Sequence, residues 1–594
     1  MRYKSAKSGG FQVFAVSGVN TVSFAITATD SASKDLLGFG VEREDPKEHQ
    51  RYYMYGFKVF GSVIPHPDET THVSTYDHPI QSFVWDDFTA KPDREYTYSF
   101  HPFRGTPKNL DRTAAPLEIT IRTEPLFSSL EHDVFFNRGV ASSQAYSRQF
   151  QNQPPDKLTG AKRTKALDWL SRELDDAILK FIGNAKSGDG LLGCFYEFRY
   201  RPVADALKDA ITRGVDVQLI VDAKVNESVD KDGKKHPSFP RLDNLAMIAA
   251  AKLPKSRVVL REARPNDIAH NKFMVLLKGA GRQPTEVWTG STNLSMGGIH
   301  GQTNVGHWVR NRAVASAYRD YWNLVHDDPG ARKGDDTAKA RQRNTDQRVA
   351  IEGLAAVPTT VGAIPAGITP VFSPRTGSGV LDLYFDSLDS AAAAGCITLA
   401  FGITKSLKDR LKKHPSGGPI TFLMLEKRDQ PTKKNRDTFV AINARNNVYS
   451  AWGSYLKDPL YQWTKETNAG LLGLNQHVSY VHSKFLLRDP LGADPIVVTG
   501  SANFSPASTN ANDENMLIIR GSQRVADIYF TEFNRIFNHY YFRAVTEATK
   551  EAGRDDPAGS LFLKEKAKEW LVKYKPGALR QKRVALFAGM KGVA

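Results

Sequence analysis

The stretch His482–Ser505 reads HSKFLLRDPLGADPIVVTGSANFS, and its pattern recurs upstream at His270–Ser295, HNKFMVLLKGAGRQPTEVWTGSTNLS. Each copy begins with a histidine and a lysine one residue apart, continues with an apolar run, and ends in Thr-Gly-Ser-x-Asn-x-Ser. Two copies with the same internal order indicate a duplicated unit. The shared positions are His270, Lys272, Gly290, Ser291 and Asn293 in the first copy and His482, Lys484, Gly500, Ser501 and Asn503 in the second.

The sequence before each motif predicts the same order of helices and strands. Before the first motif we expect helices at 166–182 and 202–212 and strands at 190–198 and 215–221. Before the second motif we expect helices at 380–394 and 406–413 and strands at 396–402 and 420–425. Even the cysteines correspond, since Cys194 and Cys396 each fall in the first strand of their half. This alternation predicts a mostly parallel sheet in each half, covered by helices on both faces.

The remainder of the chain divides around these two units. Residues 1–125 contain short alternating strands separated by Pro, Gly and Asp, which predicts an accessory antiparallel β-sandwich of immunoglobulin or fibronectin type. The first lobe is expected at 126–348, ending in a charged, exposed linker at 327–348, and the second at 349–594. The stretch from Ser560 onward predicts a basic amphipathic surface helix followed by a tail.

Composition limits the class of protein. A hydrophobic content of 41% and two cysteines in 594 residues are typical of a globular protein without a disulfide framework. No leader peptide and no run of 18 apolar residues is visible, so we expect a cytoplasmic protein, or one secreted without a visible leader. The excess of 80 Lys and Arg over 64 Asp and Glu, a net charge of +16, favours polyanionic partners, either anionic lipid surfaces or nucleic acid.

The motif residues suit a phosphate group. On a strand, a histidine and a lysine two positions apart share one face, whereas Asn271 and Phe273 point toward the packing side. A lysine repels a metal ion but binds a phosphate oxygen, and Gly-Ser-x-Asn can bring a hydroxyl and an amide to the same phosphate. Glycine permits a close backbone approach. Two such sets facing across a pseudo-twofold axis would surround one phosphorus, which predicts a two-step displacement without metal or cofactor.

The paired motifs resemble the HKD motifs of the phospholipase D superfamily, and the resemblance covers about 126–594. It implies two similar α/β/α lobes with the active site at their junction. It implies that His270 is the nucleophile and His482 the general acid. It further implies that Lys272, Lys484, Asn293 and Asn503 bind phosphate, assisted by Ser291 and Ser501, with Gly290 and Gly500 in the supporting turns.

The first copy departs from the family pattern at two positions. His-x-Lys-x4-Asp is complete in the second copy with Asp489, but the first copy has Leu277 there. Glu514 fits the acidic residue that orients a histidine in the family, whereas the first copy offers Thr303, with Gln302 beside it.

Three functions are compatible with these residues. The first is a phospholipase D-type phosphodiesterase that hydrolyses the head-group phosphodiester of phospholipids at a membrane surface, or transfers it to another alcohol. The second is a nuclease or nucleic-acid phosphodiesterase, which the charge suits equally well. The third is a non-catalytic phosphate-binding protein. Leu471, Leu472 and Leu474 could contact lipid or lie in the core. We expect a monomer, because one chain carries both half-sites.

Overall fold

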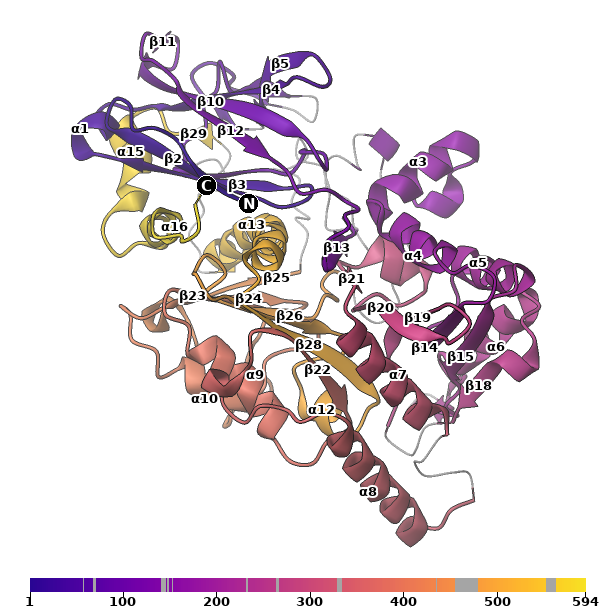
Figure 1. Ribbon diagram of the computed structural model, residues 1–594. Coiled ribbons are helices and arrows are strands. Elements are labelled where there is room, and N and C mark those ends of the chain that lie inside the picture. Colours follow the sequence, from indigo (N-terminus) through magenta and orange to yellow (C-terminus); the bar gives the residue numbers. More distant parts are fainter. Residues whose placement is uncertain are drawn as a thin grey trace.

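The computed structural model describes residues 1–56, 58–67, 71–139, 146, 149–151, 153–230, 233–262, 267–327, 334–433, 435–453, 479–551 and 562–593. Each half of the chain forms a seven-stranded sheet (Figure 1). The first sheet has the order β13 (His132–Phe136), β21 (Val305–Val309), β20 (Gln283–Gly290), β19 (Lys272–Lys278), β14 (Gly190–Phe195), β15 (Asp216–Asp222) and β18 (Val258–Arg261). The second has the order β22 (Gly367–Ser373), β28 (Glu514–Arg520), β27 (Ile496–Gly500), β26 (Phe485–Arg488), β23 (Ala394–Leu399), β24 (Ile420–Leu425) and β25 (Val448–Trp452). The two halves therefore share one topology.

The expectation of mostly parallel sheets is wrong, because both sheets are mixed. In the first, only β14–β15 and β15–β18 pair in parallel, and the second repeats this with β23–β24 and β24–β25. The other neighbours are antiparallel. Each motif folds as a hairpin, β19–β20 or β26–β27, whose short connection cannot make the crossover that parallel strands require.

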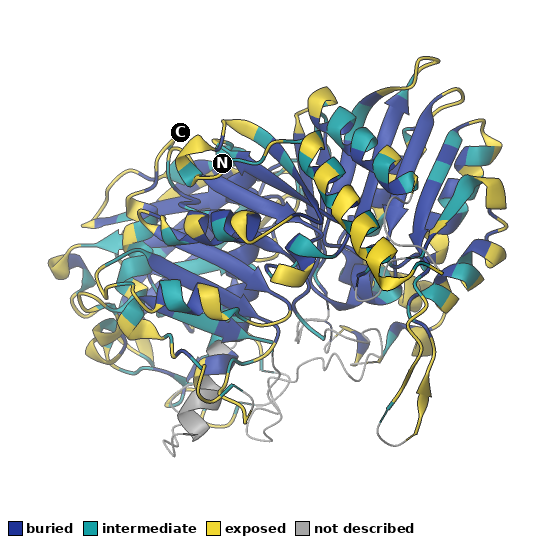
Figure 2. Cartoon of the chain, turned by 90° about the horizontal axis from the view of Figure 1, so that it is seen from below, coloured by how far each residue is buried: buried dark blue, intermediate teal, exposed yellow. Residues whose placement is uncertain are grey.

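The two sheets have separate outer cores and a shared inner core. On the outer faces, α4 (Leu174–Gly183) and α5 (Arg201–Thr212) cover the first sheet, and α9 (Gly379–Asp389) and α10 (Lys405–Leu411) cover the second. The inner faces pack together with α7 (Arg312–His326) and α13 (Gln523–Glu551) in one continuous cluster. Figure 2 shows the strands mostly buried and the helices exposed on their outward sides. This shared core fixes the position of one lobe against the other.

Two helices and the cysteines differ from the sequence-based expectation. The helix expected at 166–182 is divided into α3 (Gly160–Ser171) and α4, because Arg172 and Glu173 adopt positive φ values of 43° and 65°. The helix expected at 380–394 ends at Asp389, since β23 begins at Ala394. The cysteines lie in corresponding strands but not at equivalent positions: Cys194 is next to the last residue of β14, and Cys396 lies three residues before the end of β23.

The N-terminal region consists of two antiparallel sheets that share one core. The first has the order β1 (Arg2–Lys4), β2 (Phe11–Ser17), β3 (Val22–Ala28) and β9 (Val84–Asp87). The second joins β11 (Asn109–Asp111), β10 (Glu95–Thr106), β4 (Gly38–Asp45) and β5 (Gln50–Tyr53), with β12 (Leu117–Arg122) also paired to β10. Their facing residues form one hydrophobic cluster. The immunoglobulin or fibronectin type stays a prediction.

The C-terminal stretch does not form the single basic helix expected from the sequence. It contains β29 (Phe562–Leu563), which pairs with β7 (Val59–Phe60), and then α15 (Ala567–Leu571) and α16 (Leu579–Ala588). Trp570 of α15 is buried in the N-terminal core rather than lying on a surface helix. Its Nε1 donates to the carbonyl of Leu36 at 2.9 Å. The two ends of the chain therefore lie together, as Figure 1 shows.

The charged segment at 327–348 is also more ordered than the expected linker. Where it is described, from residue 334, it leads into α8 (Thr337–Leu354). Gln347 and Ile351 of this helix are buried, and Gln347 Nε2 donates to Asp513 Oδ1 at 2.9 Å. Within the described part of the chain, no helix combines the length and apolar character needed to cross a membrane.

Candidate functional site at the junction of the lobes

The two motif histidines lie just before the first strand of their hairpins. β19 begins at Lys272 and β26 at Phe485, so His270 and His482 precede the strands rather than lie within them, contrary to the expectation. Each histidine is nevertheless close to the lysine of its own motif. Lys272 Nζ donates to the carbonyl of His270 at 2.6 Å, and Lys484 Nζ donates to the carbonyl of His482 at 2.7 Å.

Two reciprocal backbone bridges hold these segments at the boundary between the lobes. Ala269, directly before the first histidine, pairs with Asp513 of the second lobe. Val481, directly before the second histidine, pairs with Thr303 of the first lobe. Each histidine is therefore positioned partly by the opposite lobe, as a pseudo-twofold arrangement requires.

The side chains that contact the histidines are exchanged between the lobes. His270 Nδ1 lies 2.9 Å from both Oε1 and Oε2 of Glu514, across the boundary. His482 Nδ1 lies 2.9 Å from Oδ1 of Asn304, again across the boundary. The first-copy counterpart of Glu514 is thus Asn304, and the expectation of Thr303 is wrong by one residue. The first histidine has a carboxylate partner, whereas the second has a neutral amide.

The motif serines hold these partner residues in place. Ser501 Oγ donates to Glu514 Oε2 at 2.7 Å, and Ser291 Oγ donates to Asn304 Oδ1 at 2.8 Å. The sequence separation between serine and partner is 13 residues in both halves. This equal spacing places Asn304 at the same structural position as Glu514.

The motif glycines make room for the neighbouring strand. A Cβ on Gly290, whose φ is 135°, would lie 2.2 Å from the carbonyl oxygen of Val305 in β21. A Cβ on Gly500 would lie 2.2 Å from the carbonyl oxygen of Asn515 in β28. The close approach expected at these glycines is therefore between strands of one sheet, which sets the position of the serine that follows.

The site is buried and brings two lysines close to the two histidines. His270, Lys272, His482 and Lys484 are all at most 5% exposed. Burial lowers the pKa of His270 to about 4, partly opposed by Glu514, and lowers the pKa of Lys272 to about 8, partly opposed by the same carboxylate. Burial, together with the nearby lysines and His270, lowers the pKa of His482 well below its ordinary value. Burial and the charge of Lys272 lower the pKa of Lys484 strongly. A bound anion would relieve the repulsion between these groups.

The carboxylate of Glu514 remains ionised within this site. Burial alone would raise its pKa, but His270, Lys272 and the hydrogen bond from Ser501 outweigh that effect, so that the pKa lies below its usual range. An ionised acceptor requires a proton on Nδ1 of His270, which leaves the Nε2 lone pair of the neutral imidazole available.

The motif asparagines are not equivalent in their contacts. Asn293 Nδ2 donates to Glu197 Oε1 at 2.7 Å, and Glu197 is in turn paired with Arg199 Nη2 at 2.9 Å. The buried Oδ1 atoms of Asn293 and Asn503 have no hydrogen-bond partner among the described residues. These oxygens could accept from a ligand, whereas a phosphate oxygen could be bound only by the Nδ2 groups, of which that of Asn293 already donates one hydrogen bond to Glu197.

Asp489, the third residue of the complete motif, lies away from the site. It follows β26 at the end opposite the lysine, and its carboxylate accepts from the backbone N–H groups of Ala392 and Ala393 at 2.8 and 2.7 Å. In the first half, where Leu277 takes its place, Asp189 makes the reverse connection and accepts from Gly279 N at 2.8 Å. Asp489 thus links the end of β26 to the start of β23, and Asp189 links the start of β14 to the end of β19. The same connection is present in both halves, so the loss of the motif aspartate leaves the first half-site intact.

Sequence reasoning missed several residues that shape the site: Asn304, Glu197, and the pair Asp222 and Glu426. Asp222, the last residue of β15, accepts from Ala269 N at 3.0 Å, and Glu426, which follows β24, accepts from Val481 N at 2.7 Å. Both thus support the residue directly before a motif histidine. The equal spacing from the motif serine would have identified Asn304. Glu197 had no counterpart in the second half to mark it.

Leu471, Leu472 and Leu474 lie outside the described residues. Among the residues that are described, no group of three or more His, Cys, Asp or Glu side chains could hold a metal ion.

Comparison with known proteins gives one family match and several similar solved structures. Residues 178–324 and 420–537 match the family described as cardiolipin synthase, PLD-like domain. Among solved structures, phosphatidylserine synthase from Haemophilus influenzae Rd KW20 is similar over 66% of this chain and 94% of its own, with 13% identity and a TM-score of 0.41. Nuc from Salmonella typhimurium is similar over 25% of this chain and 84% of its own, with 21% identity and a TM-score of 0.19. Yeast tyrosyl-DNA phosphodiesterase is similar over 58% of this chain and 86% of its own, with 11% identity and a TM-score of 0.29. A search of curated proteins gives no match.

Fold and site define a duplicated α/β protein with one composite site between its halves. The two regions matched by the family lie one in each half and extend through the strands that carry the motifs. These two regions match the PLD-like domain family, which confirms the resemblance noted in the sequence.

Proposed function

We propose that this protein is a phospholipase D-type phosphodiesterase that hydrolyses the head-group phosphodiester of phospholipids through a phosphohistidine on His270. The observation that carries the proposal is the unequal pairing of the histidines: Glu514 contacts His270, and Asn304 contacts His482. A carboxylate makes the first imidazole more basic than an amide would, so His270 suits nucleophilic attack. A neutral partner leaves the second imidazolium a stronger acid, so His482 suits protonation of the leaving group.

The first step forms a bond between His270 Nε2 and phosphorus. The bond from phosphorus to the leaving alcohol breaks, and the alcohol oxygen takes the proton from Nε2 of the His482 imidazolium. In the second step His482 accepts a proton from water, whose oxygen attacks phosphorus while the P–N bond breaks and its electron pair returns to His270. His482 is then protonated again, so the cycle is closed. An alcohol in place of water would give head-group transfer.

The lysines supply the charge that this reaction needs. Lys272 and Lys484 are buried and close enough for each histidine to respond to their charge. A phosphodiester carries one negative charge, and the developing charge on its non-bridging oxygens would be stabilised by two fixed ammonium groups in a site of low dielectric constant. Asn293 and Asn503 would donate to the same oxygens, and Ser291 and Ser501 would act by holding the histidine partners.

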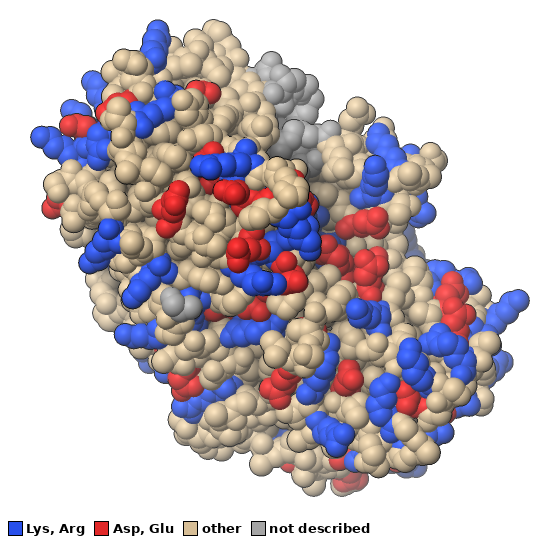
Figure 3. All heavy atoms as spheres, turned by 45° about the horizontal axis from the view of Figure 1, so that its top comes forward, with Lys and Arg blue, Asp and Glu red and all other residues tan. Residues whose placement is uncertain are grey.

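Hydrolysis of nucleic acid is the alternative that one observation favours, the net charge of +16. On the face shown in Figure 3, however, lysines and arginines are interspersed with acidic residues and form no continuous track. A phosphate backbone is usually bound along a concentrated basic surface. We therefore place phospholipid first.

Paired assays test the proposal. Choline release from phosphatidylcholine vesicles and cleavage of plasmid and oligonucleotide would be measured with the wild-type protein and with His270→Ala, all in the presence of EDTA. We expect head-group release that persists in EDTA and is lost in His270→Ala. Cleavage of nucleic acid alone would favour the alternative, and phosphate binding without turnover of either substrate would indicate a non-catalytic protein. Complete loss in EDTA, restored by a divalent ion, would contradict the lysine-based mechanism.

A further inference from the structure

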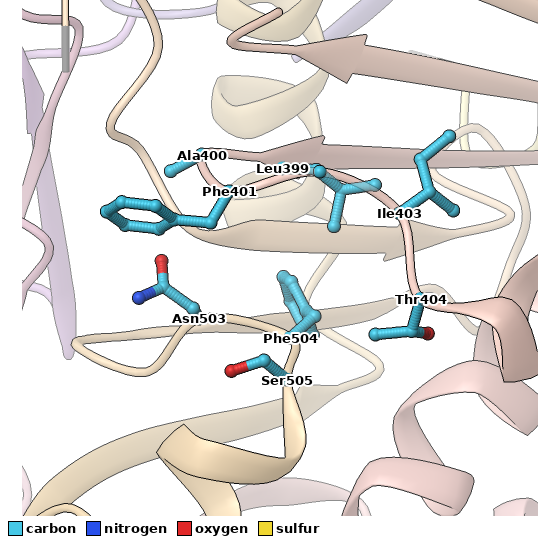
Figure 4. Close-up of a pocket in the computed structure, with 9 residues that line it drawn as sticks. Leu399, Ala400, Phe401, Ile403, Thr404, Asn503, Phe504 and Ser505 are labelled. Atoms are coloured by element: carbon cyan, nitrogen blue, oxygen red, sulfur yellow. The ribbon is translucent and has the colours of Figure 1, made fainter. Parts of the chain in front are cut away.

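A cavity of about 110 Å³ lies beside Asn503 in the second half of the site. Its walls come from the last residue of β23, Leu399, and the loop after it, which contributes Phe401 and Ile403. The motif loop contributes Phe504. Figure 4 shows the Asn503 side chain pointing toward the side on which Phe401 lies, with Phe504 deeper between the two loops. The cavity therefore opens next to a motif residue proposed to bind phosphate.

The first half carries different residues at the positions equivalent to the cavity wall. Phe195 of β14 and Leu399 of β23 occupy equivalent positions. Phe195 pairs with Val221, which precedes Asp222, and Leu399 pairs with Leu425, which precedes Glu426. Asp222 and Glu426 are the carboxylates that support the segments before the two histidines. Two residues further along, the first half has Glu197, which is hydrogen-bonded to Asn293, and the second half has Phe401.

The next residue along reinforces this difference. In the first half, Phe198 forms a backbone bridge with Leu294 and closes the space between the loops. The equivalent residues of the second half, Gly402 and Phe504, line the cavity instead. The two half-sites are thus chemically different, one polar and closed, the other apolar and open.

The lining chemistry indicates the kind of group that fits. Among the described residues that line the cavity, none has a charged side chain, and the polar side chains are those of Asn503, Thr404 and Ser505. Phe401 is 65% exposed, so its phenyl ring is accessible to a ligand that enters the cavity. A cationic head group would lack a carboxylate here, and a nucleobase would lack most partners for its polar edge. Apolar cavities of about 150 Å³ hold a molecule of the size of benzene, so this one has room for a short hydrocarbon segment.

We propose that the cavity between Phe401 and Phe504 binds a hydrocarbon chain attached to one ester oxygen of the substrate phosphodiester. This inference rests on the proposed function and names the part of a lipid that the second half-site recognises. Burial of each methylene against these walls would strengthen binding, and it would hold the phosphodiester in one orientation between Asn293 and Asn503.

A series of 4-nitrophenyl phosphodiesters tests the assignment at a fixed leaving group. The second ester group would be methyl, butyl, hexyl or the 5′-thymidyl group, and kcat/KM would be measured by nitrophenolate release. For the wild-type protein we expect kcat/KM to rise about 10-fold or more from methyl to hexyl. In Phe401→Ala, and more strongly in Phe401→Glu, which introduces the residue of the first half, the hexyl-to-methyl ratio should fall toward one.

Phe88→Ala serves as the matched control, because Phe88 is an exposed phenylalanine in the N-terminal region. It should leave the hexyl-to-methyl ratio unchanged. Hydrolysis without dependence on chain length would overturn the cavity assignment while leaving the proposed function intact. So would a larger effect of Phe401→Ala on the thymidyl substrate than on the hexyl substrate, since the cavity would then bind a base. Failure of the wild-type protein to hydrolyse any of the four would overturn the proposed function itself, and the assignment with it.

Discussion

Glu514 of the second lobe holds the imidazole of His270 of the first, with both carboxylate oxygens 2.9 Å from Nδ1. The carboxylate comes from the half that does not contain the histidine, and 244 residues separate the two. Neither half alone can therefore provide an oriented, basic His270. In the reciprocal contact, the amide of Asn304 faces Nδ1 of His482. The two histidines therefore have chemically different partners.

Glu514→Gln tests this inequality. The glutamine keeps the size of the side chain and can still contact Nδ1, but it removes the negative charge that raises the pKa of His270. The pKa of His270 should therefore fall further, and kcat/KM should decrease by about 10²- to 10⁴-fold as the imidazole becomes a weaker nucleophile with a less defined tautomer. The decrease in kcat/KM would be measured from the steady-state hydrolysis of a 4-nitrophenyl phosphodiester.

The matched variant is Asn304→Asp, which places a carboxylate beside His482. It should raise the pKa of His482 and make it a weaker acid. Turnover of substrates with poor leaving groups should then slow more than turnover of 4-nitrophenyl substrates, which need little protonation. Equal effects of the two variants on both kinds of substrate would contradict unequal roles.

Glu197 gives a prediction about pH. Burial lowers the pKa of Lys272 to about 8, and the charges of Glu514 and Glu197 oppose that shift. Lys272 should therefore lose its proton, and kcat/KM should decrease, as the pH rises through about 8. Glu197→Gln removes one of the charges that hold the pKa up, so the alkaline decrease should move to lower pH.

A pH profile of kcat/KM distinguishes this effect from a general loss of structure. Asp243→Asn is the control, because Asp243 pairs with Arg199 and is not among the groups that shift the pKa of Lys272. Its profile should coincide with that of the wild-type protein. A Glu197→Gln profile of unchanged shape, reduced equally at every pH, would contradict an electrostatic role for Glu197.

The local parts of the site could be predicted from sequence, and the parts made between lobes could not. Each motif keeps its histidine, lysine, serine and asparagine within one hairpin, so the pattern alone brings them together. The contact between Glu514 and His270 depends on how the two sheets pack, which no local pattern specifies. The pattern predicted an acidic residue only in the second copy and Thr303 at the corresponding position of the first, so it overlooked the amide of Asn304 one residue further on.

The errors in the fold have a similar origin. Alternating helices and strands predicted parallel sheets, but the hairpins β19–β20 and β26–β27 determine the direction of most strands. The C-terminal stretch was interpreted from its local pattern of basic and apolar residues, whereas Trp570 packs in the N-terminal core, far away in sequence. In both cases contacts distant in sequence outweigh a local preference.

Asp489→Asn should affect stability more than chemistry. The Asp489 carboxylate accepts from the backbone at Ala392 and Ala393 and lies at the far end of β26 from Lys484. Loss of its charge should lower the free energy of unfolding by about 1–3 kcal/mol, because these N–H groups lose a charged acceptor. Urea unfolding would measure this free energy, and Asp494→Asn serves as the control because Asp494 is exposed. A large decrease in kcat with unchanged stability would show that Asp489 acts in the site.

Removal of residues 1–125 should destabilise the second lobe. Arg2 is buried, pairs with Asp527 of α13 at 2.8 Å, and donates to the carbonyls of Pro490 and Leu491 beside the second motif. Replacing one partner of such a buried pair costs about 3–5 kcal/mol. Arg2→Met in the full chain should therefore lower the midpoint of thermal unfolding. A truncated protein with the thermal stability and activity of the full chain would contradict this coupling.

The separate roles of the histidines can be resolved in time. If His270 is the nucleophile, His270→Ala should abolish turnover of every substrate, including a 4-nitrophenyl phosphodiester. His482→Asn should still form the covalent intermediate with that substrate, because nitrophenolate departs without protonation. It should then stall, since no group activates water. Rapid mixing should show a burst of about one nitrophenolate per protein molecule, followed by little further release.

The site of the covalent bond decides between the two assignments. Mass spectrometry of His482→Asn, quenched after the burst, should find the phosphoryl group on the peptide that contains His270. The physical reason is the pairing at the lobe boundary: the carboxylate of Glu514 keeps a proton on Nδ1 of His270, so that Nε2 carries the free electron pair. The same experiment on His270→Asn should give neither burst nor adduct. An adduct on the His482 peptide in that variant would reverse the assignment, with the amide-paired histidine as the nucleophile.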